Sequence, residues 1–238
     1  MASWDKYKSE VIISVFLFVY LLFTLTNVNS NLGNAYLWFL GISVILLLIN
    51  ILVFDKDVRI TFQKEKGKWL NVIFAGIIAW VAVLVTSFVV FKVVNPEQAN
   101  FASIISSFGA ANPAFSSSKI LNWFTVSFAI GFSETNFFAG RILEFVADLL
   151  RIPLSKNNLK NLKFVMLAIS LGVLFAFFHA TAKGVAATNS LIVVAIMMII
   201  SIFMVAYYGE TRQAIAMHVI SNGVAGIMLL MAGGTLFG

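Results

Sequence analysis

Long apolar runs separated by short polar segments make up most of this chain. A helix needs roughly 20 mostly apolar residues to cross a membrane. Seven segments come close to that length, at about 11–29, 35–54, 69–93, 120–140, 164–182, 190–208 and 213–236. The pattern predicts an all-α fold, a polytopic transmembrane helix bundle of about seven helices. We expect it to form a single membrane-embedded domain over residues 1–238.

The composition agrees with this class of protein. Hydrophobic residues make up 61% of the chain and charged residues 11%, whereas a soluble domain averages about 25% charged residues. The chain contains no cysteine, so it has no disulfides and no thiolate chemistry. The longest polar gap, at about 94–119, is expected to be a loop that includes a short interfacial helix.

Basic residues are concentrated in alternate connections between the predicted spans. With seven spans, 13 of the 16 lysines and arginines fall on one side of the membrane. The positive-inside rule makes that side cytoplasmic. We therefore expect a multi-pass protein of the cell membrane with its N-terminus in the cytoplasm and its C-terminus outside. The net charge of +6 belongs to these loops and does not indicate a nucleic-acid partner.

Charged residues recur at helical spacing after the fourth span. They are Arg141, Glu144, Asp148 and Arg151. Apolar residues fill the positions between them, so the segment is expected to be an amphipathic extension with a solvated charged face. Ion pairs are expected between residues three apart on this face, Arg141 with Glu144 and Asp148 with Arg151. Pro153 should end the helix at or near Ile152.

Three ionisable side chains lie inside apolar segments, which makes them candidates for a functional site. They are Glu134, His179 and His218, on three separate spans. Asn222 follows His218 by four residues and shares its helix face. Each also has a purely structural interpretation. Glu134 could be a neutral acid that bonds a backbone carbonyl or Asn136, and the histidines and Asn222 could simply join helices by hydrogen bonds.

The order of these residues resembles the CAAX prenyl protease and bacteriocin-processing family. That order is a Glu on one span, Phe175-x-x-x-His179 on the next and His218-x-x-x-Asn222 two spans later. The resemblance runs from roughly Phe128 to Leu230 and includes the turn Tyr208-Gly-Glu-Thr-Arg before the last helix. It implies an intramembrane glutamic protease with a protease-like core at about 120–236.

The resemblance also implies a role for each site residue and a mechanism without metal or other cofactor. Glu134 would be the base that activates a water molecule, with His179 as its partner. His218 and Asn222 would stabilise the oxyanion, and Phe175 would support His179. The substrate would be a hydrophobic or lipidated protein or peptide, with access from the cytoplasmic side, and the lipid bilayer would surround the protein.

The first motif of that family departs from this sequence. The family has Glu-Glu-x-x-x-Arg, and this chain has Ser133-Glu134-Thr135, with Ala139 at the position of the arginine. If Glu134 matches the first Glu, Thr135 replaces the second. In that case Arg141, two α-helical turns after Glu134, could take over part of the role of the missing arginine. If Glu134 matches the second Glu, Ser133 replaces the base and the protein should be inactive.

The expected depths of the two histidines in the membrane also limit how their rings can meet. At 1.5 Å per residue, His218 lies about 9 Å above Arg212, whereas His179 lies about 24 Å above Lys163. The rings can therefore meet only if the turn at 209–212 is sunk below the membrane surface, or if the fifth span starts lower than Lys163 suggests. Snorkelling of Arg212 allows the first arrangement.

Three functions and one rival chemistry are compatible with the sequence. The first function is a membrane-embedded endopeptidase. The second is a catalytically inactive family member that acts as a membrane scaffold or immunity subunit with a partner in a membrane complex. The third is a proton-coupled transporter that uses Glu134 and the histidines as a relay. The rival chemistry is a zinc site of two His and one Glu, although no His-Glu-x-x-His motif is present.

Overall fold

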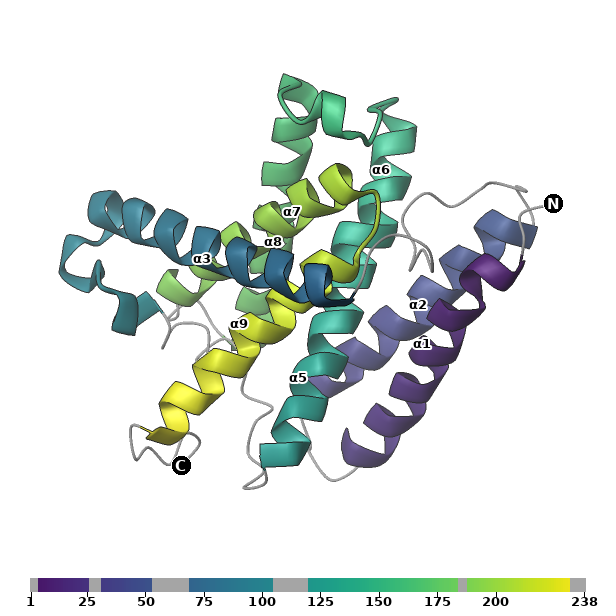
Figure 1. The fold of residues 1–238 in the computed structure, drawn as a ribbon, viewed down its shortest axis with the longest axis horizontal. Coiled ribbons are helices and arrows are strands. Elements are labelled where there is room, and N and C mark those ends of the chain that lie inside the picture. The colour runs from purple at the N-terminus through teal and green to yellow at the C-terminus, as the bar shows by residue number, and fades with distance from the viewer. Residues whose placement is uncertain (1–3, 26–30, 53–68, 105–119, 184–187, 232–238) are drawn as a thin grey trace.

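The computed structural model describes residues 4–25, 31–52, 69–104, 120–183 and 188–231 (Figure 1). Within these ranges the regular elements are helices and no strand occurs, so the all-α prediction is confirmed. The longer helical elements are α1 (Trp4–Leu25), α2 (Asn31–Leu52), α3 (Trp69–Val94), α5 (Ile120–Glu134), η2 (Thr135–Ile142), α6 (Leu143–Leu149), α7 (Leu162–Lys183), α8 (Thr188–Tyr208) and α9 (Arg212–Met231). Short 3₁₀ helices lie at η1 (Pro96–Gln98) and η3 (Lys156–Asn158).

Each of the seven predicted spans coincides with a helix, but fewer of them qualify as membrane-spanning. Among the described residues, three helical stretches are long and apolar enough to cross a membrane: Trp69–Val94, Leu162–Ala180 and Asn189–Tyr208. Two further apolar stretches, Glu10–Tyr20 and Leu37–Ile49, are shorter. The three long helices indicate a membrane protein. The seven-span topology and the placement of the termini stay predictions.

Helix α8 lies at the centre of the molecule. In the apolar stretch of α8 that could span a membrane, 61% is buried, whereas the corresponding share in α3 is 33%. Helix α7 packs along α8, and α9 packs against α3, α5 and α8. The α1–α2 pair forms one flank of the molecule (Figure 1). Away from this flank, α3 runs at a steep angle to α5 and α6. This arrangement brings α5, η2, α7 and α9 around one interior region.

Two glycines allow the closest approaches between these helices. A Cβ added at Gly76 of α3 would lie 2.9 Å from the Cβ of Ala216 on α9. A Cβ added at Gly172 of α7 would lie 2.5 Å from Ile199 Cγ1 and 2.9 Å from the Ala195 carbonyl oxygen on α8. Small residues at helix contacts are a common way to bring membrane helices together, because association there depends on close packing.

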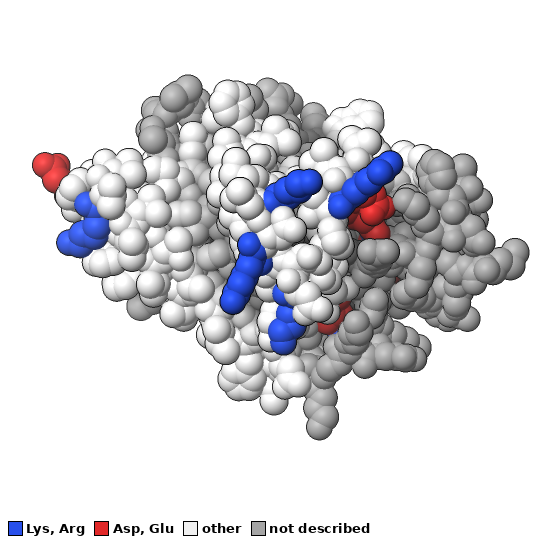
Figure 2. Space-filling model, turned by 90° about the horizontal axis from the view of Figure 1, so that it is seen from above, with Lys and Arg blue, Asp and Glu red and all other residues white. Residues whose placement is uncertain are grey.

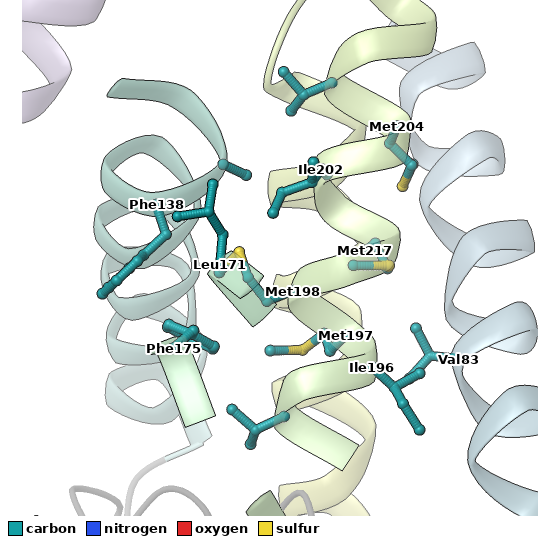
Figure 3. Close-up of a cluster of buried hydrophobic side chains, with 14 of the residues drawn as sticks. Val83, Phe138, Leu171, Phe175, Ile196, Met197, Met198, Ile202, Met204 and Met217 are labelled. Atoms are coloured by element: carbon teal, nitrogen blue, oxygen red, sulfur yellow. The ribbon is translucent and has the colours of Figure 1, made fainter. Parts of the chain in front are cut away.

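Flexible and aromatic side chains fill the space around α8. Figure 3 shows Met204 of this helix and Met217 of α9 on one side, and Met198 directed toward Leu171 on the side where Phe138 and Phe175 lie. Methionine is unbranched and fills irregular gaps well. This packing forms an apolar wall next to the polar residues described below.

Basic residues gather on the face that Figure 2 shows, seen from above the α6–α7 end of the molecule. The connection from α6 through η3 to α7 carries four exposed basic residues, Arg151, Lys156, Lys160 and Lys163. The Lys156 ammonium group lies 4.6 Å from the ring centroid of Tyr207 at the end of α8. The sequence assigns this connection to the cytoplasmic side. The basic connection at 53–68 lies outside the described residues.

The prediction of a solvated charged face after the fourth span is wrong for Arg141 and Glu144, whereas Asp148 and Arg151 are exposed as it expected. Arg141 is 2% exposed and Glu144 9%, whereas Phe145 is 62% and Leu149 70% exposed. Arg141 and Glu144 therefore face the interior, where the predicted pair between them is present with 3.3 Å between Nη1 and Oε2. The outer face of α6 carries apolar side chains together with Asp148.

The end of α6 also lies slightly earlier than expected. The helix ends at Leu149, and Arg151 adopts a left-handed conformation with φ 54°. The backbone N–H of Ile152 donates to the Ala147 carbonyl at 2.7 Å and that of Arg151 to the Asp148 carbonyl at 3.1 Å. This pair of bonds is a Schellman motif, which satisfies the last carbonyls of a helix. Pro153 follows it.

Candidate active site

The polar site is built where α5 changes its winding. Immediately after Glu134 the helix becomes the π-helix η2, which runs for eight residues from Thr135 to Ile142. π-helical segments are rare and are frequently found at functional sites. Here the π-helix is almost entirely buried. The change in winding alters which side chains follow Glu134 on the inner face.

Glu134 lies between the two histidines of the chain. Its Oε1 is 3.4 Å from His179 Nε2, and its Oε2 is 3.3 Å from His218 Nε2. All three residues are buried, with exposures of 1%, 2% and 1%. The structure therefore brings together side chains from α5, α7 and α9 in one interior site, as the sequence predicted for a shared polar pocket.

His179 holds one ring nitrogen on its own helix and presents the other to Glu134. The Nδ1 atom lies 3.0 Å from the carbonyl oxygen of Phe175. A carbonyl oxygen only accepts hydrogen bonds, so Nδ1 carries the hydrogen of this bond. Nε2 faces Glu134 Oε1 at 3.4 Å, and a proton on either of these two atoms would join the groups by a hydrogen bond.

His218 is fixed by the residue that follows Glu134. Its Nδ1 lies 2.9 Å from the hydroxyl oxygen of Thr135, and its Nε2 faces Glu134. All three groups are satisfied when Thr135 donates to Nδ1 and Nε2–H donates to the carboxylate. In that tautomer the Nε2–H of His218 is directed at Glu134. Thr135 was noted in the sequence only as the residue in place of the family's second Glu.

Two further predicted residues, Asn222 and Phe175, lie on the helices that carry the histidines. Asn222 is buried at 2% exposure, one turn after His218 on α9. The Phe175 ring contacts both histidine rings, with centroid distances of 4.5 Å to His179 and 6.5 Å to His218. The apolar ring thereby restricts both imidazoles.

Ser133 and Glu134 point in different directions. The hydroxyl of Ser133 donates to the Ile130 carbonyl of its own helix at 3.0 Å, whereas the carboxyl group of Glu134 contacts both histidines. Of these two neighbours, only Glu134 directs its side chain at the histidines.

The turn between α8 and α9 is sunk into the molecule. Glu210 accepts hydrogen bonds from Arg212 Nε at 2.7 Å and from Gln213 Nε2 at 2.7 Å, and all three side chains are buried. A Cβ added at Gly140 of η2 would lie 3.4 Å from Thr211 Cγ2, so this turn packs directly on the π-helix. A sunken turn was one of the two arrangements that allow His179 and His218 to meet at one depth.

A second buried ionic cluster involves a residue that the sequence analysis did not select. Glu10 of α1 is 1% exposed and forms an ion pair with Arg141. Its Oε1 also accepts a hydrogen bond from Asn136 Nδ2 at 3.1 Å. Arg141, which was expected to assist Glu134, is thus held by Glu10 and Glu144. Glu10 lies at the polar start of an apolar run, and its position gave no signal of burial.

A metal centre has no support in the geometry. Among the residues that the structure describes, no group of three or more His, Cys, Asp or Glu side chains could hold a metal ion. The two histidines present Nε2 to different oxygens of Glu134 rather than to a common point.

No family model, curated protein or solved structure matches this chain. The relation to the CAAX protease family therefore rests on the order of residues noted above and stays a prediction. What the site can do chemically must be argued from its own geometry.

Proposed function

We propose that this protein is an intramembrane endopeptidase of the glutamic type, similar to the CAAX prenyl proteases. The observation that carries the proposal is the contact of one buried carboxyl group with two imidazoles from different helices. Burying ionisable groups is costly, and a cluster of three of them in an apolar interior is typical of a functional site.

The chemistry is hydrolysis of a peptide bond by a water molecule. Glu134, coupled to His179, removes a proton from the water molecule while the water oxygen attacks the carbonyl carbon of the peptide bond. The carbonyl oxygen becomes an oxyanion, and His218 and Asn222 donate hydrogen bonds to it. When the tetrahedral intermediate collapses, the C–N bond breaks and the Glu134–His179 pair returns the proton to the leaving amine. The products are a carboxylate and an amine.

The surroundings support an apolar substrate. The site residues are buried among helices that include the apolar α7, so a substrate would arrive from the bilayer rather than from bulk water. The basic connection between α6 and α7 would face the cytoplasm. We infer that the substrate is a hydrophobic or lipidated protein or peptide, cleaved on the cytoplasmic side of the membrane.

The proposal is tested by peptide cleavage with the purified protein in lipid nanodiscs. A panel of apolar peptides and peptides with a prenylated C-terminal cysteine is incubated in water enriched in ¹⁸O. Hydrolysis places ¹⁸O in the new carboxylate, which mass spectrometry detects. We expect cleavage by the wild type and none by Glu134→Gln, which keeps the shape of the side chain but is a far weaker base.

Two outcomes would overturn the proposal. Absence of cleavage with every peptide would favour the inactive scaffold or immunity subunit. Ion flux into liposomes that depends on a pH gradient and on Glu134, without cleavage, would favour the proton-coupled transporter.

A further inference from the structure

Glu10 reaches the site region from the first helix of the chain. It lies 126 residues before Asn136, yet both side chains are buried and share a hydrogen bond. The same oxygen, Oε1, also accepts from Arg141. One carboxyl oxygen of α1 therefore holds two residues of the π-helix.

These two residues are five apart, which is the spacing of π-helical hydrogen bonds. In an α-helix of 3.6 residues per turn, residues five apart point about 140° away from each other. That angle directs the two side chains to different faces of the helix, which works against contact with a single carboxyl group on a neighbouring helix. The winding of η2 turns Asn136 and Arg141 to the same side, where Glu10 accepts hydrogen bonds from both.

The held segment is continuous with the reacting residues. Asn136 follows Thr135, which bonds His218, and Thr135 follows Glu134, which contacts both histidines. Any change from π to α winding at Asn136 would rotate these neighbours relative to α7 and α9. The position of Glu134 therefore depends on the hydrogen bonds that Glu10 accepts from Asn136 and Arg141.

The cluster of Glu10, Arg141 and Glu144 is buried, which strengthens the hold of Glu10 on the π-helix. Glu10 and Arg141 are 1% and 2% exposed, and Glu144 adds a second carboxylate to the same guanidinium group. A buried charge is tolerated when it is paired and hydrogen-bonded. Arg141 has little alternative to this position, because its inward orientation depends on the two carboxylates.

We propose that Glu10 is a positioning residue for the site: it holds the π-helix through Asn136 and Arg141 and so sets Glu134 between the two histidines. The proposal deepens the proposed peptidase function and rests on it for its activity readout. It assigns α1 a part in the site, although the resemblance to the protease family covers only the second half of the chain.

The test uses the two histidines as reporters. Because the chain has only two, protein labelled with ¹⁵N-histidine gives two sets of ring signals, which His179→Gln and His218→Gln assign. The variants are Glu10→Gln, which removes the charge, and Glu10→Asp, which keeps it. Ser14→Ala is the matched control, since Ser14 is buried one turn further along α1 and is not part of the cluster.

We expect Glu10→Gln to shift the ring signals of both histidines and to alter the pH profile of cleavage. Its kcat should fall about 100-fold, the scale of a misplaced catalytic group, with little change in KM. Glu10→Asp should recover part of kcat, and Ser14→Ala should match the wild type. If Glu10→Gln unfolds, Asn136→Ala removes one bond and leaves the ion pair, and it should shift the same signals less.

The readouts separate this proposal from the peptidase proposal. Unchanged histidine signals in folded Glu10→Gln, or a kcat and pH profile equal to those of Ser14→Ala, would overturn the positioning role. Shifted histidine signals in a protein that cleaves no peptide would uphold the positioning role and overturn the peptidase function.

Discussion

Thr135 and His218 are joined by a hydrogen bond of 2.9 Å between the threonine hydroxyl and Nδ1 of the ring. The residue directly after the proposed base therefore orients the ring that faces the base. If Glu134 matches the first glutamate of the CAAX protease motif that the sequence resembles, Thr135 stands in place of the second. The hydroxyl can donate to Nδ1, which leaves Nε2–H directed at Glu134 and, in a substrate complex, at the oxyanion.

Replacing Thr135 by Val should remove this orientation while keeping the shape of the side chain. A net hydrogen bond is worth about 0.5–1.5 kcal/mol, so kcat should fall about two- to tenfold, with KM nearly unchanged. Thr135→Ser keeps the hydroxyl and should retain most of the activity. Steady-state kinetics on one peptide checks this, and equal kcat values for the Val and Ser variants would contradict the assigned role.

Asn222→Ala should remove one donor to the oxyanion. Loss of such a donor lowers kcat by about 100- to 1,000-fold in other hydrolases. Ser221→Ala is a close control, because the Ser221 hydroxyl donates to the Met217 carbonyl of its own helix at 2.9 Å. We expect kcat to fall in the first variant and stay near wild type in the second. A similar kcat in both would exclude Asn222 from the oxyanion site.

Gly76→Ala should destabilise the contact between α3 and α9. The new methyl group would lie 2.9 Å from Ala216 Cβ and 3.0 Å from the Met217 backbone nitrogen, so the helices must separate. Overpacking of this kind costs about 1–3 kcal/mol. Gly41→Ala in α2 is the control, since a Cβ there has no neighbour within 4 Å. Thermal unfolding in detergent should show a lower Tm for Gly76→Ala alone, and equal Tm values would contradict the packing.

Glu210→Ala should weaken the sunken turn before α9. The substitution leaves Arg212 buried without the carboxylate that accepts from its Nε and Nη2. Breaking a buried ion pair from one side costs about 3–5 kcal/mol. The matched variant Glu97→Ala removes an exposed carboxylate in η1 and should leave the Tm near that of the wild type. A Tm for Glu210→Ala equal to that of Glu97→Ala would show that the turn is not held by this cluster.

The sequence predicts the helices and the core of the site well. Apolar runs define each long helix because chain length and hydropathy dominate in a membrane protein. Glu134, His179 and His218 were found because ionisable residues inside apolar runs are rare, and the structure brings all three together. Their catalytic roles stay predictions.

The sequence fails where winding and burial depend on tertiary contacts. Nothing in the residues after Glu134 predicts a π-helix, and α-helical spacing gave Arg141 the wrong surroundings. Glu10 looks like one more charged residue at the start of a span, yet Arg141 and Asn136 stabilise it in the interior. Such long-range pairs leave no local pattern in one sequence.

The most direct measurement compares Ser133→Ala with Glu134→Gln in a single cleavage assay. The two neighbours represent the two possible alignments of the base, but only Glu134 contacts the histidines. We predict cleavage by the wild type and Ser133→Ala and none by Glu134→Gln, with the latter still folded by its Tm. Cleavage by Glu134→Gln at the wild-type rate would contradict the account.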